Sequence, residues 1–329
     1  MLLPNPLLAI DTRRAAESIT KYIKKIVTDE SAKGVVIALN GSVDSAVLAT
    51  LAIHALGKKA VEVYYLYDRH SPAKSMQKAL LWAHRFSLNL KIFDIEPVMR
   101  RKLVYKPLIM KITAYSGLIN RILAKAYTLV YHQSPFISTL QLQDSSGSDL
   151  YPAYIRHLAS ACNTTNIYRR EFLQKLAKEH NMIVLGTTNR SDFFIGWFVK
   201  DGISDMPYSP LGRLYKTQIR QLAQFLKLPA AISDQNPSSD MIKGITDEFV
   251  IGISYDDLDI ILDGLNRHLD DNQIIQQGQT IQQIKNVQMM NQLSKWKRRS
   301  KHHRPPVGGT IKAGLRLYSK SWLTKSAPF

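Results

Sequence analysis

One junction constrains the fold of this chain more than any other. An apolar run at 35–39 leads directly into the polar turn 40–45, Asn-Gly-Ser-Val-Asp-Ser, and then into an apolar helical pattern that extends to residue 56. A strand, a tight turn and a helix in this order direct backbone N–H groups and the positive end of a helix dipole at one point, where an anion can bind. The sequence therefore predicts a phosphate-binding turn, in which Asp44 is positioned to hold a magnesium ion that bridges phosphate oxygens.

Two other interpretations of the turn 40–45 have to be weighed. The turn lacks the lysine of a Walker loop, which argues against a kinase-type phosphate loop. It also fits an ordinary strand-to-helix connection that is capped by a Ser or Asp side chain. Motifs farther along the chain decide between these interpretations.

Apolar strands alternate with helical patterns along much of the chain. We expect strands at 35–39, 61–67, 90–95 and 182–187, and helices at 12–28, 43–56, 73–88, 168–180 and 215–227. This alternation is typical of a parallel sheet that is covered on both faces. The predicted fold class is α/β, with a doubly wound parallel sheet that binds ligands at the carboxyl ends of its strands. The turn 40–45 and Thr187 both lie at such ends.

Residues 98–161 interrupt the alternation and are expected to form a helical insertion. From Leu108 to Leu129, apolar residues recur at spacings of four and three, which indicates one stripe of a long helix. We expect this stripe to pack against the body of the protein or against a second subunit, with a basic membrane-surface helix as the alternative. The polar stretch 141–149 is expected to be a mobile loop.

Composition narrows the class of protein without selecting a function. The 329 residues fit a single domain over 1–329 with a basic tail at 295–329. The net charge of +18 is compatible with nucleic acid, an anionic membrane face or a polyphosphate ligand. A single cysteine, Cys162, excludes an internal disulfide and a thiolate metal cluster. The start lacks the features of a signal peptide, and no run approaches a membrane span, so the expected location is the cytoplasm.

Several further motifs follow the turn in a fixed order. They are Gly186-Thr187-Thr188-Asn189-Arg190-Ser191-Asp192, Gly196-Trp197-Phe198-Val199-Lys200-Asp201-Gly202, Ser209-Pro210-Leu211, Leu214-Tyr215-Lys216-Thr217-Gln218, Pro237-Ser238-Ser239-Asp240, Thr246-Asp247-Glu248, Gly252-Ile253-Ser254-Tyr255-Asp256-Asp257-Leu258-Asp259 and His302-His303-Arg304-Pro305-Pro306. In this order the segments resemble ammonia-dependent NAD synthetases, over about residues 12–97 and 162–308. The turn itself resembles the Ser-Gly-Gly-x-Asp-Ser loop of the ATP pyrophosphatases, with Asn40 and Ser42 replacing its first Ser and second Gly.

The resemblance implies a fold and a reaction. The fold is adenine nucleotide alpha-hydrolase-like, which is Rossmann-like. In the reaction, the carboxylate of deamido-NAD attacks the α-phosphate of ATP, and ammonia then displaces AMP to leave NAD. ATP is the co-substrate, Mg²⁺ is required, and the enzyme is a homodimer. Neither nucleic acid binding nor stable membrane insertion is implied.

The resemblance also assigns roles to individual residues. Catalytic roles fall on Asp44, Lys200 and Lys216, and the metal is held by Asp44 and Asp192, where Asp192 replaces a Glu of the family. ATP contacts fall on Asn40, Gly41, Ser42, Val43, Ser45, Thr187, Lys216 and Ser238. Substrate contacts fall on Asn163, Lys200, His302 and His303. Cys162 stands where the family has Gly and has no assignable His partner, so free ammonia or a partner protein must supply the nitrogen.

The chain departs from the family on the dinucleotide side. A substrate-binding Arg is replaced by Ile167, an Asp of the substrate loop is replaced by Pro207, and the closing Lys is replaced by His303. Ile cannot form a fork to phosphate, and the Pro side chain cannot accept a hydrogen bond. Two alternatives follow: a paralogue that adenylates another carboxylate, and a nucleotide-binding pseudoenzyme that acts as a dimeric scaffold. The basic charge of the chain adds a third, a tRNA-directed ATP pyrophosphatase, which the absence of paired cysteines disfavours.

Overall fold

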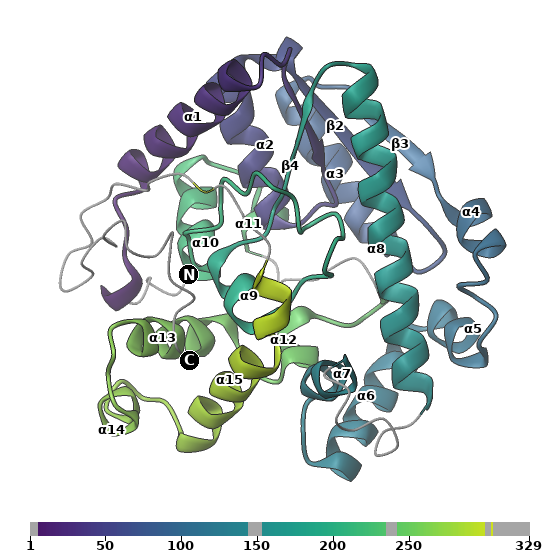
Figure 1. The fold of residues 1–329 in the computed structure, drawn as a ribbon, viewed down its shortest axis with the longest axis vertical. Coiled ribbons are helices and arrows are strands. Elements are labelled where there is room, and N and C mark those ends of the chain that lie inside the picture. The colour runs from purple at the N-terminus through teal and green to yellow at the C-terminus, as the bar shows by residue number, and fades with distance from the viewer. Residues whose placement is uncertain (1–5, 144–152, 235–241, 300–303, 305–329) are drawn as a thin grey trace.

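The fold is organised by a four-stranded parallel sheet with the order β3-β2-β1-β4. The strands are β1 (Val35–Ala38), β2 (Val61–Tyr67), β3 (Leu90–Asp94) and β4 (Ile183–Leu185). In the central strand, Val35 pairs with Val61 on one side and with Ile183 on the other. The computed structural model describes residues 6–143, 153–234, 242–299 and 304 (Figure 1). All four expected strands form. Strands β2 and β3 lie on one side of β1 and β4 lies on the other, so the strand order reverses between β1 and β4, where open sheets of this kind bind ligands.

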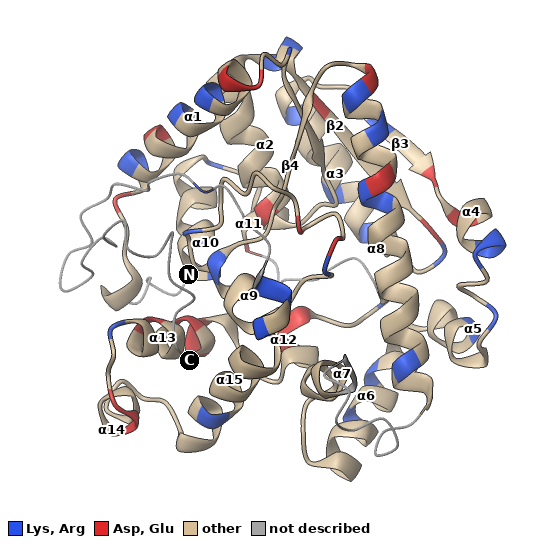
Figure 2. Cartoon of the chain, viewed as in Figure 1, with Lys and Arg blue, Asp and Glu red and all other residues tan. Residues whose placement is uncertain are grey.

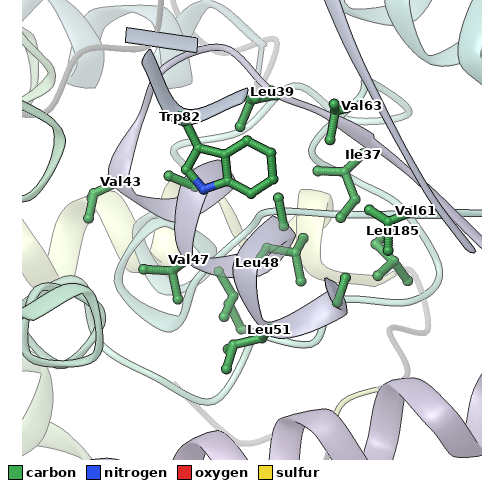
Figure 3. Close-up of a cluster of buried hydrophobic side chains, with 14 of the residues drawn as sticks. Ile37, Leu39, Val43, Val47, Leu48, Leu51, Val61, Val63, Trp82 and Leu185 are labelled. Atoms are coloured by element: carbon green, nitrogen blue, oxygen red, sulfur yellow. The ribbon is translucent and has the colours of Figure 1, made fainter. Parts of the chain in front are cut away.

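One face of the sheet is covered by α1 (Thr12–Asp29), α2 (Val43–Leu56), α3 (Ala73–Phe86) and α10 (Lys216–Phe225). Alternate residues of the central strand, among them Ile37, point into this layer, where Trp82 and Leu51 are fully buried (Figure 3). The indole N–H of Trp82 donates to Thr50 Oγ1 at 3.0 Å, so its polar atom is satisfied inside the core.

The opposite face is covered mainly by α8 (Ala153–Glu179) and α4 (Glu96–Arg101). Val36 of β1 and Tyr64 of β2 point into this layer and pack with Leu173 of α8. Figure 1 shows α1 and α2 on one side of the strands and α8 on the other. The expected α/β class with a doubly wound parallel sheet is therefore confirmed. The helix expected at 168–180 is the second half of α8, which begins at Ala153.

A second, all-helical layer lies beyond the carboxyl edge of the sheet. It contains α7 (Pro135–Gln143), α9 (Arg190–Ile195), α12 (Asp247–Ile251), α13 (Tyr255–Asn266), α14 (Asp271–Ile275) and α15 (Ile281–Leu293). Its apolar core, centred on residues such as Leu258, Ile261 and Val287, is separate from the two clusters on the sheet. Further short helices form at η1 (Pro6–Leu8), η2 (Lys58–Ala60), α11 (Ala230–Ser233) and η3 (Lys295–Arg299).

The prediction of one long helix between Leu108 and Leu129 is wrong. The segment forms α5 (Leu108–Tyr115) and α6 (Gly117–Tyr131), because Ser116 is extended with φ −140° and ψ 126°. The apolar stripe does not pack against the body either, since Leu108 and Leu129 are 70% and 75% exposed.

Polar contacts dock α6 against the loop before α12 instead. Asn120 Nδ2 donates to Thr113 O at 2.9 Å and to Lys243 O at 3.0 Å, so the two helices are bent toward that loop. The backbones of Gly117 and Gly244 also touch there, and a Cβ on Gly244 would lie 2.5 Å from the Cα of Gly117. Only residues without a side chain fit this approach.

Two other expectations fall partly outside the described residues. Of the stretch 141–149, residues 141–143 end α7 and the remainder is not described. Of the tail 295–329, the structure describes only η3 and Arg304. Basic residues are spread over several elements, and Figure 2 shows Lys and Arg on α1, α4 and α8 with Asp and Glu among them. Within the described ranges, no helix is long and apolar enough to cross a membrane.

Candidate active site

The polar turn after β1 forms a compact cradle at the start of α2. Asn40 Oδ1 accepts from Ser42 N at 3.2 Å and from Ser45 Oγ at 2.9 Å. Ser42 caps α2 by accepting from Ser45 N at 3.3 Å. Gly41 has a φ of 75°, and a Cβ there would lie 2.4 Å from Ser75 O. The polar side chains therefore fold inward, and the free N–H end of α2 faces the carboxyl edge of the sheet.

A second turn, after β4, brings a carboxylate to the same place. Asn189 caps α9, and its Oδ1 accepts from Asp192 N at 2.8 Å. The Nδ2 of Asn189 donates to Asp44 Oδ1 at 2.9 Å and to Asp192 Oδ2 at 2.6 Å. Asn189 therefore links two carboxylates that are 148 positions apart by residue number, and it is itself fully buried.

The third component comes from the first turn of α10. Lys216 is 3% exposed, and its Nζ donates to Asp44 Oδ2. The side chain of Lys216 also lies over the ring of Tyr255, with Nζ 5.2 Å from the centroid. On the other side, Tyr255 OH donates to Asp192 Oδ1 at 2.6 Å. The lysine and the two carboxylates are thus held by side-chain bonds from α9, α10 and α13.

The electrostatics of this cluster are those of a site with excess negative charge. Burial raises the pKa of Asp192 to about 8, with Asp44 adding to the shift and Lys216 opposing it. Burial lowers the pKa of Lys216, but the attraction of Asp44, Asp192 and Asp247 outweighs it, so the net shift is upward. Asp44, Asp192 and Asp247 therefore all act on one ammonium group, and a divalent cation would offset the repulsion among the carboxylates.

The donor set fits Mg²⁺. This ion prefers hard oxygen ligands and commonly takes one or two carboxylates together with substrate phosphates. Asp44 and Asp192 supply two carboxylates held side by side by Asn189, next to the N-terminus of α2. A phosphate at that N-terminus would lie within reach of the same ion.

A cavity of about 330 Å³ opens from this cluster. At the sheet edge it is lined by Asn40, Ser42, Asp44, Thr187, Asp192 and Lys216. Farther out its walls become apolar and aromatic, and they include Leu123, Tyr127, Phe136, Leu158 and Trp197. All of these except Trp197 belong to the 98–161 segment, so this segment forms much of the outer wall.

The structure brings most of the expected site residues together. Asn40, Ser42, Asp44, Asn163, Thr187, Asp192 and Lys216 all line the cavity. Gly41, Val43 and Ser45 shape the turn behind it. Ser238, His302 and His303 lie outside the described residues.

Lys200 lies apart from the cavity lining. Its Nζ is 3.2 Å from Asp205 Oδ2 and 3.3 Å from Asp201 Oδ1. Asp205 is 4% exposed and also accepts from Asp201 N at 2.8 Å. Ile167 and Pro207 are likewise absent from the lining. On α8 the cavity face carries Arg169 instead.

Sequence reasoning missed Asn189, Tyr255, Asp247 and Asp259 as parts of this site. All four lie within or next to the motifs quoted above, yet a motif gives no direction for a side chain. The helical spacing of Tyr255 and Asp259 was the available signal, because residues four apart share one face of a helix.

Comparisons with known proteins agree with the geometry. A family model described as NAD synthase matches residues 15–111 and 122–301. The NH(3)-dependent NAD(+) synthetase of Coprothermobacter proteolyticus is 31% identical over 254 residues, which cover 76% of this chain and 83% of that protein. The protein of the same name from Thermotoga maritima is 30% identical over 259 residues, covering 77% and 88% of the two chains.

Solved structures show the same fold. The NMN synthetase from Francisella tularensis aligns with a TM-score of 0.65 at 22% identity, over 89% of this chain and 98% of that one. The NH3-dependent NAD synthetase from Campylobacter jejuni, in complex with the nitrate ion, aligns with a TM-score of 0.60 at 20% identity, over 87% and 96%. The resemblance drawn from the ordered motifs is therefore confirmed, and the chain belongs to the NAD synthase family.

Proposed function

We propose that this chain is an ammonia-dependent NAD synthetase. It uses ATP to adenylate the carboxylate of deamido-NAD, and ammonia then converts the adenylate to the amide. The observation that carries this proposal is the buried cluster of Asp44, Asp192 and Lys216 at the carboxyl edge of the sheet, in a chain of the NAD synthase family. Membership in that family supports ATP as the co-substrate.

The residues of the chain suit the first half-reaction. The turn 40–45 and the N-terminus of α2 bind phosphate oxygens, and Lys216 adds a positive charge beside them. The substrate carboxylate attacks the α-phosphorus, the bond to the bridging oxygen breaks, and pyrophosphate leaves with the electron pair. Asp44 and Asp192 would hold Mg²⁺, which when bound neutralises charge on the polyphosphate.

The second half-reaction needs a neutral amine and a dry site. Ammonia adds to the acyl carbon, AMP leaves, and one proton is released. The apolar walls of the cavity exclude water that would otherwise hydrolyse the adenylate. Burial raises the pKa of Cys162 to about 12, so this thiol is unsuited to act as a glutaminase nucleophile.

The products distinguish this mechanism from ordinary ATP hydrolysis. With deamido-NAD, ATP, Mg²⁺ and ammonium, we expect AMP, pyrophosphate and NAD in equal amounts. Without ammonium, exchange of labelled pyrophosphate into ATP should persist while NAD formation stops, because adenylation comes first. Release of ADP and orthophosphate would overturn the proposal.

A different carboxylate substrate is the second candidate. It is favoured by Ile167 and Pro207, and by the pairing of Lys200 with the buried Asp205, all of which remove charged contacts to a dinucleotide. A panel of carboxylates in the pyrophosphate exchange assay decides between the two. Exchange with another carboxylate but not with deamido-NAD would keep the adenylating chemistry and replace the substrate.

We also propose that the chain forms a homodimer through α5 and α6. These helices carry a row of exposed apolar side chains: Leu108, Tyr115, Leu118, Ile122, Leu129 and Val130 are between 57% and 84% exposed. Exposed apolar side chains gathered on two successive helices in this way are typical of an interaction site. A two-fold interface would bury these side chains on both subunits, because the same surface of each copy takes part in the contact.

Charged substitutions on this face should therefore break the dimer. Leu118→Glu combined with Ile122→Glu is expected to raise the dimer Kd by about a hundredfold or more, because each apolar side chain contributes about 1.5–3 kcal/mol on burial. Light scattering coupled to gel filtration measures the change. Leu80→Glu on α3, where Leu80 is 44% exposed, is the matched control and should leave the mass unchanged. A monomeric wild type, or a double variant that stays dimeric, would contradict the assignment.

A further inference from the structure

One buried carboxylate next to the site is not used by the mechanism. Asp259, on α13, is fully buried. Its Oδ1 accepts from Ser191 Oγ, and its Oδ2 accepts from Thr217 N at 2.9 Å and from Thr217 Oγ1 at 2.8 Å. Three donors therefore converge on this one carboxylate, which offsets the cost of burying its charge.

Both partners of Asp259 are direct neighbours of site residues. Ser191 precedes Asp192 on α9, and Thr217 follows Lys216 on α10. Ser191 Oγ, which donates to Asp259, also accepts from Lys216 N at 2.9 Å. The first N–H groups of any helix have no acceptor within the helix itself. In α10 the first two are satisfied by side chains from α9 and α13.

A second residue of α13 reaches the same two elements. Tyr255 lies one turn before Asp259, donates to Asp192 Oδ1 and underlies Lys216 Nζ. One face of α13 therefore contacts the metal-side carboxylate and the phosphate-side lysine at the same time. The separation between Asp192 and Lys216 is fixed through this face.

We propose that Asp259 is a positioning residue: through Ser191 and Thr217 it sets the placement of Lys216 relative to Asp192, and so controls the binding of the metal–ATP complex. This proposal rests on the proposed adenylating function of the site. In the proposed role, Asp259 does not itself touch a substrate. Its carboxylate is needed because only an acceptor without N–H groups can receive all three bonds.

The test compares Asp259→Asn with Asp263→Asn. Asp263 is the matched control, because it lies one turn farther along α13, is 1% exposed and pairs with Arg267, away from the cluster. In the Asn variant at 259, one oxygen is replaced by an NH₂ group, so a donor faces a donor. We expect Asp259→Asn to raise the KM for ATP and to lower the pyrophosphate exchange rate by about 10–100-fold, the range seen when a supporting partner of a ligand is removed.

The KM for deamido-NAD should stay within about twofold of wild type for both variants. Asp263→Asn should also leave the KM for ATP and the pyrophosphate exchange rate unchanged. A merely structural role predicts something else: both variants would lower activity in step with the melting temperature. A double-mutant cycle with Ser191→Ala should be non-additive, because the two residues act through one network. Additive effects, or an unchanged KM for ATP, would overturn the proposal.

Two further measurements keep the proposal testable. If Asp259→Asn fails to fold, Thr217→Val deletes one bond while leaving the carboxylate in place, and it should shift the KM for ATP in the same direction by a smaller factor. Calorimetric titration of the protein with ATP in the presence of Mn²⁺ reports binding without turnover. If the wild type binds ATP but shows no exchange, the adenylating function fails on its own, and weaker ATP binding by Asp259→Asn still supports the positioning role.

Discussion

Replacing Asp44 with Asn is expected to lower kcat/KM for ATP by about a thousandfold or more. The substitution keeps the size of the side chain but removes a hard anionic ligand and the counter-charge of Lys216. Losing one preorganised charge contact in a dry site costs about 10²–10³ in rate, and loss of the metal adds to it. Pyrophosphate exchange at saturating deamido-NAD measures the effect directly.

Stability has to be separated from chemistry in this variant. Removing one partner of a buried ion pair destabilises a protein by about 3–5 kcal/mol, because the other charge stays buried and unpaired. Asp44→Asn combined with Lys216→Met removes both charges, and it should recover much of the melting temperature lost by Asp44→Asn alone. Its exchange activity should remain at the level of the worse single variant. Recovered activity in the double variant would show that Asp44 acts only through folding.

The centre of the sheet was predictable from the sequence because β1 and β2 are buried on both faces. Largely apolar runs such as 35–39 and 61–67 are usually buried in a folded protein, and the helices between them follow from their own spacing. The turn 40–45 was predictable for the same reason, since it joins two such elements. The carboxyl edge then followed from topology alone.

The helical segment beyond residue 98 shows where periodicity fails. The apolar stripe from Leu108 to Leu129 continues without a break in the sequence, but Ser116 interrupts the backbone. Contacts to Lys243 and Gly244, far away in sequence, decide the direction of α6. The stripe also faces outward, so packing against the body was wrong, and packing against a second subunit stays a prediction.

The first half of α8 was missed for a local reason. Residues 163–166, Asn-Thr-Thr-Asn, have low helix propensity and lie in the middle of the helix. Tertiary packing overrides that preference, because Ala161 and Leu173 on either side are buried against the sheet. The same run gives the helix its polar cavity face at Asn163 and Asn166.

Predicting the candidate site required knowing which side chains meet. Asp44, Asp192 and Lys216 were assigned individually through the family resemblance, and the structure adds that Asn189 and Tyr255 hold them in one cluster. Those two residues have ordinary roles in sequence, a helix cap and a buried aromatic. Only their long-range bonds distinguish them, and such bonds span more than sixty positions.

Replacing Lys216 with Gln should have opposite effects on turnover and on metal binding. The pyrophosphate exchange rate is expected to fall by about 10²–10³, because a buried positive charge beside the phosphates is lost. Binding of Mn²⁺ alone should become tighter by about tenfold or more. In the ligand-free protein the ammonium of Lys216 occupies Asp44 Oδ2 and repels a cation at short range, and both effects disappear in the variant.

Lys297 offers the matched control for this prediction. It lines the same cavity, is 6% exposed against 3% for Lys216, and donates to the backbone oxygens of Gly196 and Phe198 rather than to a carboxylate. Lys297→Gln should therefore leave the affinity for Mn²⁺ unchanged in a calorimetric titration. If Lys216→Gln weakens Mn²⁺ binding instead, the lysine is required to hold Asp44 in place for the metal, and the competition between ammonium and metal is refuted. Tighter metal binding together with lost exchange would show that Lys216 acts on the phosphates, with Asp44 exchanging its ammonium partner for the metal when ATP arrives.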